Sequence, residues 1–191
     1  MRIILASKSP RRQELLRAIG ITEFEIMPSD SELAASRAAP PEETVTAIAA
    51  GKAADIAAKC GPDDIIIAAD TLVYIDGSPL GKPKSADEAY AMLRALSGRA
   101  HTVYTGIAVF RDGRRFSAAV GTDVYFRELS DAEIEAYVAS GEPMDKAGAY
   151  GIQGLGALLV ERVDGEYSNV VGLPLCTLGR LLKEAGYSVL G

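Results

Sequence analysis

The stretch LASKSPRRQELL near the N-terminus combines helix-start residues with two arginines. Ser7 or Ser9 can cap the helix, and Pro10 suits its first position. Arg11 and Arg12 then fall in the first turn, where the helix dipole disfavours a cation by about 0.3–1 kcal/mol. Free backbone N–H groups at such a position bind anions. The stretch therefore predicts a phosphate-binding site.

Two further charged residues lie in apolar surroundings. Asp70 stands between the runs IIIAA and TLV, where an ionised carboxylate is costly to bury unless a metal ion, a catalytic water or a structural lysine compensates it. Lys52 falls on the apolar stripe of a helix expected from 42 to 60, either as a site residue or with its amine reaching water. Lys82, in a Gly-Lys-Pro loop just after the Asp70 strand, is by itself a weak candidate, because a loop lysine is usually only solvated.

Three other residues are weaker candidates. Glu32 lies on a polar loop and is a surface charge unless that loop returns to Asp70. Gln153 sits in the glycine-rich loop DKAGAYGIQGLG, and its amide can complement the edge of a base, although the glycines also suit a plain tight loop. His101 is the single histidine, and without a G-x-S-x-G motif we interpret it as structural.

Several nucleotide and metal motifs are absent from the sequence. GSPLGKP lacks the spacing and the Ser or Thr of a phosphate-binding P-loop, and the glycine-rich loop does not match G-x-G-x-x-G. One histidine and two distant cysteines do not provide a nitrogen- or sulfur-rich metal site. Any metal is therefore expected to be a hard, oxygen-ligated ion, most simply Mg²⁺.

The composition indicates a single domain, residues 1–191, with a sizeable core. The chain is 48% hydrophobic and 24% charged, with a net charge of −6, which argues against general binding of nucleic acid. It contains no apolar run near the ~20 residues of a membrane span and no signal-peptide pattern. We therefore expect a cytoplasmic protein that keeps its cysteines reduced.

Strand and helix patterns alternate, which predicts an α/β fold. Ser85 with Glu88, and Ser130 with Glu133, each have the spacing of a helix capping box. Strands are expected within 3–6, 63–77, 102–110, 116–126 and 158–163. Helices are expected to begin at residue 10 and to span 42–60, 85–98, 130–141 and 174–186.

Taken together, the blocks LASKSPRRQELL, AADTLV, LGKP, LSGRAHTVYTG, EPMDKAGAYGIQGLG and YSNVVGLP resemble the Maf family of nucleotide pyrophosphatases. The resemblance runs in order over nearly the whole chain. It implies an ITPase-like (Maf/Ham1-type) fold, with an elongated mixed sheet flanked by helices and two lobes around a central cleft. It also implies metal-dependent hydrolysis of a nucleoside triphosphate to the monophosphate and pyrophosphate. The AGAYGIQG block resembles the dTTP/UTP branch.

The resemblance also implies roles for individual residues. Asp70 matches the proton acceptor, and the positions that set substrate preference match Arg11, Thr71 and Gln153. The other matching cleft positions are Ser7, Arg12, Glu32, Lys52 and Lys82. On this basis Ser7 and the two arginines grip the triphosphate, the two lysines add positive charge, and Asp70 and Glu32 hold Mg²⁺ (or Mn²⁺ or Co²⁺). Many relatives have an acid where this chain has Ser31, and if that acid helps to hold the metal in them, Asp30 or water must replace it here.

Other functions compatible with the same residues are a non-catalytic nucleotide-binding regulator, a phosphatase that acts on terminal phosphates, and a pyrophosphatase for a modified nucleotide such as 7-methyl-GTP. Product analysis separates them, because a regulator releases nothing and a phosphatase releases orthophosphate. The expected partner is the nucleoside triphosphate alone, with neither nucleic acid nor membrane, and the resemblance suggests a homodimer.

Overall fold

The computed structural model describes residues 1–29 and 39–191. The elements are, in order, β1 (Ile3–Leu5), α1 (Pro10–Ala18), β2 (Glu25–Ile26), α2 (Pro41–Ala57), β3 (Ile65–Ile75), β4 (Ser78–Leu80), α3 (Ala86–Leu96), β5 (Ala100–Arg111), β6 (Arg114–Phe126), α4 (Asp131–Ala139), the 3₁₀ turns η1 (Glu142–Asp145), η2 (Ala147–Ala149) and η3 (Gly154–Leu158), β7 (Val160–Asp164), α5 (Tyr167–Val171) and α6 (Leu175–Glu184).

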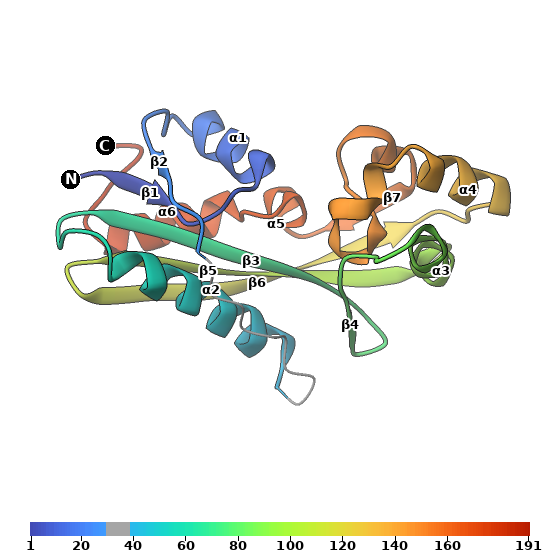
Figure 1. Ribbon diagram of the computed structural model, residues 1–191, viewed down its shortest axis with the longest axis horizontal. Coiled ribbons are helices and arrows are strands. Elements are labelled where there is room, and N and C mark those ends of the chain that lie inside the picture. Colours follow the sequence, from blue (N-terminus) through green and yellow to red (C-terminus); the bar gives the residue numbers. More distant parts are fainter. Residues whose placement is uncertain (30–38) are drawn as a thin grey trace.

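The described strands form a seven-stranded mixed sheet in the order β2-β1-β3-β5-β6-β7, with β4 added to β3. Strand β1 runs parallel to β2 and β3, and the pairs β3–β5, β5–β6 and β6–β7 are antiparallel. The long strands β3, β5 and β6 extend through the whole molecule and carry helices at both ends (Figure 1). The predicted α/β class with an elongated mixed sheet is confirmed.

Helices cover both faces of the sheet in the first lobe. Side chains alternate along β3, so Ile65, Ile67 and Ala69 face one core and Ile66 and Ala68 face another. Helices α1 and α6 complete the first of these cores, and α2 completes the second (Figure 1). This double cover explains why the strand is apolar on both faces.

The second lobe is built on the far ends of the same strands. Val73 of β3 and Val103 of β5 join a separate core with Leu93 of α3 and Ile134 and Tyr137 of α4. The two lobes therefore share one sheet but have different cores (Figure 1).

Local signals in the sequence were correct at several element ends. Ser130 and Glu133 form the complete capping box of α4. At α3 the Ser85 side chain accepts a hydrogen bond from the Glu88 backbone, but the Glu88 carboxylate accepts from the Lys84 backbone, so only half of that predicted box forms.

The start of α1 differs from the prediction. Ser9 is its N-cap residue but makes no side-chain cap, and the Ser7 hydroxyl accepts from the Ser9 backbone and from Arg12. The short elements β2, β4 and α5 were not predicted, because they are too brief to carry a periodic pattern. No helix among the described residues has the length and apolar character that a membrane crossing requires.

Candidate active site

A gap in strand pairing opens the edge of β3. Strand β1 pairs with Ile65 to Ile67, and β4 pairs with Val73 to Ile75. No described strand covers that edge of β3 between these two contacts. Because the edge is open, residues from both faces of β3 can reach the same space, and Asp70 and Thr71 do so although they point to opposite sides of the sheet.

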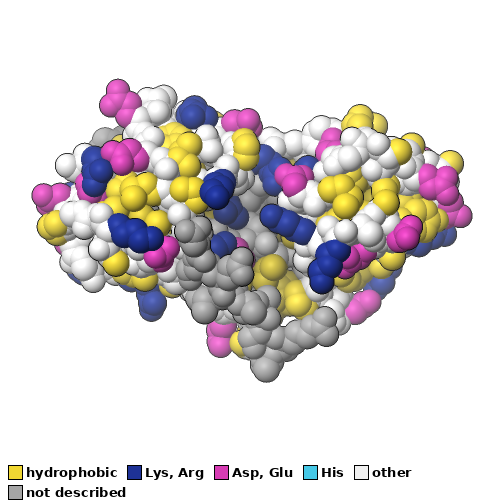
Figure 2. Space-filling model, viewed as in Figure 1, with side chains coloured by type: hydrophobic (Ala, Val, Ile, Leu, Met, Phe, Trp, Pro, Cys, Tyr) yellow, Lys and Arg dark blue, Asp and Glu magenta, His cyan; other side chains and the backbone are white. Residues whose placement is uncertain are grey.

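A cleft with a volume of about 680 Å³ lies at this gap, between the lobes. Figure 2 shows the molecule hollowed between its two halves, with Lys and Arg side chains gathered around the hollow. Six lysines or arginines and two aspartates line the described part of the cleft, which gives that lining a charge of +4 in a chain of net charge −6. The cleft is therefore a local anion-binding surface on an acidic protein.

Arg12 is held tightly at the first-lobe wall of the cleft. Its Nε donates to the carbonyl of Gly172 at 2.8 Å, and its Nη1 donates to the carbonyl of Ala69 at 2.9 Å and to Ser7 Oγ at 3.1 Å. Its Nη2 donates to Thr71 Oγ1 at 3.2 Å. One of the five guanidinium N–H bonds is left for a ligand. Burial lowers the pKa of Arg12, but an arginine remains charged at neutral pH.

The hydroxyl of Thr71 belongs to a buried chain of hydrogen bonds. It accepts from Arg12 and contacts Thr105 Oγ1 at 2.9 Å, and Thr105 Oγ1 donates to the backbone carbonyl of Asn169. The Asn169 amide in turn donates to Thr122 Oγ1 at 2.9 Å. Thr71 therefore connects Arg12 to the interior of the sheet, and its hydroxyl already has a donor and an acceptor.

Asp70 and Lys52 form an ion pair on the α2 side of β3. Lys52 Nζ lies 2.6 Å from Asp70 Oδ1, and the two side chains are only 23% and 17% exposed. Gly106, opposite Asp70 on β5, makes the close approach possible, because a Cβ there would lie 2.2 Å from the backbone oxygen of Val45 on α2. Asp70 is thus compensated by a lysine, one of the partners that the sequence left open, and the Lys52 amine binds this carboxylate at the cleft instead of reaching into open water.

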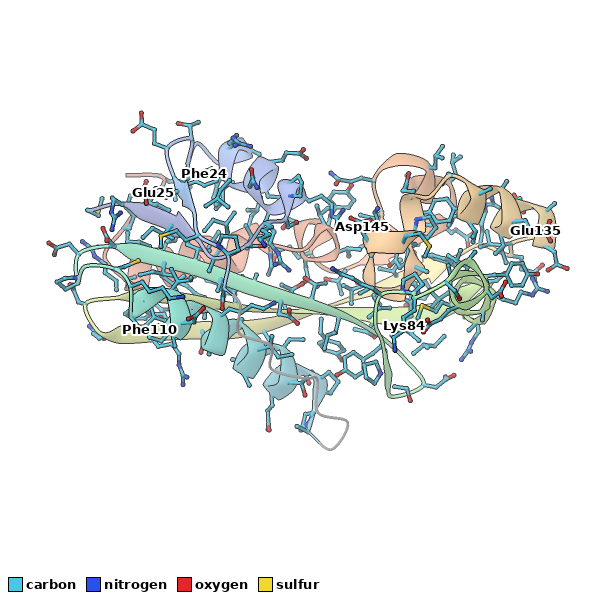
Figure 3. All side chains as sticks on the ribbon, in the orientation of Figure 1. Phe24, Glu25, Lys84, Phe110, Glu135 and Asp145 are labelled. Atoms are coloured by element: carbon cyan, nitrogen blue, oxygen red, sulfur yellow. The ribbon has the colours of Figure 1, made fainter. Side chains whose placement is uncertain are left out.

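Arg11 reaches across the cleft to the second lobe. Its Nη1 lies 3.6 Å from Asp145 Oδ2, and Lys146 Nζ donates to the other carboxylate oxygen of Asp145 at 2.7 Å. Figure 3 labels Asp145, which lies on the side of the second lobe that faces α1. Partial burial opposes the effect, but the two cations hold the pKa of Asp145 below its ordinary value. Arg11 and Lys146 are thus paired with a carboxylate that an anionic ligand can displace.

The second-lobe end of the cleft is largely apolar. Its lining includes Val73, Val103, Tyr150 and Ile152, and Gln153 stands beside them. The Gln153 side chain is exposed and makes no hydrogen bond to the described residues, so its amide donor and acceptor are available to a ligand. An apolar slot with one free amide suits a flat heterocycle that has polar groups on its edge.

His101 lies behind this end of the cleft, where it packs against the lining residue Tyr150. His101 is 3% exposed, and its Nε2 lies 2.7 Å from the Tyr150 hydroxyl. Burial lowers the pKa of His101 to about 4, so the ring is neutral at pH 7. The His101, Phe126 and Tyr150 rings pack edge to face. The structural role predicted for His101 agrees with this packing.

Almost all of the predicted site residues meet in the cleft. The predicted residues that line it are Ser7, Arg11, Arg12, Lys52, Asp70, Thr71, Lys82 and Gln153. Glu32 lies outside the described residues, as do Asp30 and Ser31. The sequence reasoning missed Asp145, Lys146 and Tyr150, although all three belong to the glycine-rich block that carried the resemblance.

The donor set suits one kind of metal ion. No group of three or more His, Cys, Asp and Glu side chains occurs in the described part of the chain, so nothing there resembles a closed metal cage. Mg²⁺ is commonly held by one or two carboxylates together with substrate phosphates. Asp70, at the cationic end of the cleft, fits that arrangement.

The chain is similar in sequence to known proteins over almost its whole length. A family model described as Maf-like protein matches residues 2–185. A dTTP/UTP pyrophosphatase of Moorella thermoacetica is 50% identical over 192 residues, covering 100% of this chain and 98% of that protein. One of Caldicellulosiruptor bescii is 47% identical over 195 residues, covering 99% and 97%. A solved HAM1 protein of Coxiella burnetii has a TM-score of 0.49 and 18% identity, covering 66% of this chain and 73% of that chain.

Proposed function

The chain belongs to the Maf-like protein family, and from that membership we propose that it hydrolyses dTTP and UTP to the nucleoside monophosphate and pyrophosphate. The relatives named dTTP/UTP pyrophosphatase support this activity. The observation that carries it in the structure is the two-part cleft, with a carboxylate among cations at one end and an apolar slot with a free amide at the other. The first part matches a triphosphate, and the second matches a base.

The phosphates would lie against the cations of the first lobe. Arg11 exchanges Asp145 for a phosphate oxygen, since an arginine fork binds phosphate well, and Arg12 contributes its one free N–H bond. Lys52 and Lys82 supply point charges from the other walls. These contacts screen the negative charge that builds up on the leaving pyrophosphate.

Asp70 would act as the base. Its carboxylate orients a water molecule and takes a proton from it while the water oxygen attacks the α-phosphorus. The bond between the α-phosphorus and the bridging oxygen breaks, and the electron pair leaves with pyrophosphate. A divalent ion, Mg²⁺ by preference, would be held by Asp70, Glu32 and phosphate oxygens and would supply neutralisation of phosphate charge.

Gln153 would read the base. Thymine and uracil present a carbonyl–NH–carbonyl edge, which an amide and nearby backbone groups can complement. Cytosine carries an amino group at one of these positions, so a donor that complements thymine and uracil there would lose its acceptor. The preference for dTTP and UTP over CTP follows from this contact.

We also propose a cytoplasmic location, in keeping with the two free cysteines, Cys60 and Cys176, and a homodimeric state, which the family resemblance suggests. The acidic net charge supports a small-molecule substrate in preference to nucleic acid.

A product assay tests the proposed function. The protein is incubated with Mg²⁺ and dTTP, UTP, CTP, ATP, GTP or 7-methyl-GTP, and monophosphate, pyrophosphate and orthophosphate are measured. Monophosphate and pyrophosphate from dTTP and UTP are expected, and Asp70→Asn should abolish them. Asp123→Asn is the matched control, because this carboxylate lies on β6 outside the cleft and binds Thr102 at 2.7 Å.

Other products would overturn the proposal. Orthophosphate would place the attack at a terminal phosphorus and make the protein a phosphatase. Tight nucleotide binding without any product would make it a sensor. Turnover of 7-methyl-GTP in preference to dTTP would contradict the assignment of Gln153 to a pyrimidine edge.

A further inference from the structure

The loop that carries Gln153 is tied down on both sides by two residues that do not line the cleft. After Gln153, the backbone N–H groups of Leu155 and Gly156 donate to the two carboxylate oxygens of Glu142, each at 3.0 Å. Before Gln153, the backbone N–H of Gly151 donates to the Tyr137 hydroxyl at 3.3 Å. The loop is therefore fixed at three backbone positions.

Glu142 and Tyr137 act as one unit, because the Tyr137 hydroxyl donates to Glu142 Oε1 at 2.9 Å. Burial raises the pKa of Tyr137, so its proton remains available for this bond. Burial alone would also raise the pKa of Glu142, but the hydrogen bonds from Gly156, Leu155 and Tyr137 hold it below the ordinary value. Glu142 is thus an ionised carboxylate that accepts three hydrogen bonds.

The glycines around Gln153 provide independent support, because they let the loop approach this unit closely. A Cβ on Gly154, whose φ is +67°, would lie 2.7 Å from Glu142 Oε2. A Cβ on Gly156 would lie 2.7 Å from the Tyr137 hydroxyl and 2.0 Å from the backbone oxygen of Gly151. The loop therefore packs on Glu142 and Tyr137 with no room for side chains at these positions.

Gln153 itself has no comparable support. Its side chain is exposed and forms no hydrogen bond within the described chain, so only the backbone on either side determines where its amide lies. A glutamine side chain without hydrogen bonds of its own discriminates between bases only if the backbone that carries it is held in one position.

On the basis of the proposed function, we propose that Glu142, together with Tyr137, is a positioning residue that sets base selectivity by fixing the Gln153 loop. Glu142 does not touch the substrate. It holds the backbone on both sides of the residue that does, and the chemistry at Asp70 does not depend on it.

Glu142→Gln is the sharpest variant, because it preserves size and removes one acceptor. The carboxylate meets three donors, whereas a glutamine places an NH₂ group against either Leu155 or the pair formed by Gly156 and Tyr137. At least one backbone N–H then loses its partner. We expect the ratio of kcat/KM for dTTP to that for CTP to fall about tenfold, the scale of one hydrogen bond to a charged group, mainly through a higher KM for dTTP.

A double-mutant cycle identifies the route of the effect. Gln153→Ala should lower the same ratio, and adding Glu142→Gln to it should lower the ratio no further. Tyr137→Phe should act in the same direction as Glu142→Gln, because it removes the contact with Gly151, and it provides a second test if the first variant folds poorly.

Glu133→Gln is the matched control. It makes the same chemical change in the same lobe, at the capping box of α4, without touching the loop. It should lower the melting temperature but leave the dTTP to CTP ratio unchanged.

The outcomes distinguish this inference from the proposed function. An equal fall in kcat for both nucleotides, or an additive double variant, would show that Glu142 is merely structural and would overturn the inference. An unchanged ratio in Glu142→Gln and Tyr137→Phe, with normal wild-type selectivity, would also overturn it. Wild-type protein that releases no pyrophosphate from dTTP would instead overturn the proposed function.

Discussion

Lys52 and Asp70 form an ion pair of 2.6 Å between a helix on one face of the sheet and the open edge of the central strand. The pair connects the α2 core to the cleft. Both side chains are mostly buried, where a single charge would be unstable. The two opposite charges compensate each other, so the pair can be buried together.

We predict that Lys52→Met lowers kcat/KM for dTTP about 100-fold, because it removes a cation from the phosphate end and leaves Asp70 without its partner. Steady-state pyrophosphate release measures the effect. Lys59→Met is the matched control: Lys59 lies just beyond α2, its side chain is 53% exposed, and it forms an ion pair with Asp55 at 2.9 Å. Similar losses in the two variants would contradict a specific role for Lys52.

Arg11 and Arg12 are neighbours in the sequence, but they should respond differently to replacement by lysine. Arg12→Lys loses most of the four hydrogen bonds to Gly172, Ala69, Ser7 and Thr71, so we expect the free energy of unfolding to fall by about 2 kcal/mol.

Arg11→Lys should change the free energy of unfolding by less than about 0.5 kcal/mol, since Arg11 has only a 3.6 Å pair with an exposed Asp145, but it should weaken nucleotide binding. Urea unfolding and equilibrium binding of dTTP with Asp70→Asn as background measure the two effects. Equal destabilisation by both variants would refute this division of roles.

Stability should fall as the pH drops from about 6.5 towards 4 because of His101. Its pKa is about 4 in the folded protein, mainly through burial and despite the opposing charge of Asp123, and 6.5 is its ordinary value. The unfolded chain therefore binds the proton more readily in this range. The contribution is complete above pH 6.5, is lost as the pH falls through the window and amounts to about 3 kcal/mol at most.

The measurement is the free energy of unfolding in urea at pH 7 and pH 5, for the wild type and for His101→Gln. Glutamine keeps a polar partner for Tyr150 but does not titrate. The wild type should lose more stability than the variant between the two pH values, and parallel curves would rule out His101 as the source.

The sequence predicted the parts of the fold that depend on local chemistry. The apolar run of β3, the strands expected within 102–110 and 116–126 and the capping box at Ser130 all have short-range causes, and all occur in the structure. The half-formed box at Ser85 marks the limit of such rules, because the Glu88 carboxylate had a second donor nearby, the backbone N–H of Lys84.

Long-range features could not be predicted in this way. The free edge beside Asp70 depends on where β1 ends and where β4 begins to pair, and β4 is too short to be visible as a pattern. No sequence pattern around Glu142 indicates its role. The backbone groups that bind its carboxylate follow it by thirteen and fourteen residues and come close to it only in the folded loop.

The continuous strands beneath the cleft have a mechanical consequence. The pairing of β3 with β5 runs without a break from Ile66 to Tyr74 and includes Asp70 and Thr71, and β6 pairs with the other edge of β5. A hinge between the lobes would have to rupture this hydrogen-bonded ladder. The continuous sheet therefore opposes a widening of the gap by lobe opening, and we expect a purine, which is wider than a pyrimidine, to gain little space in this way.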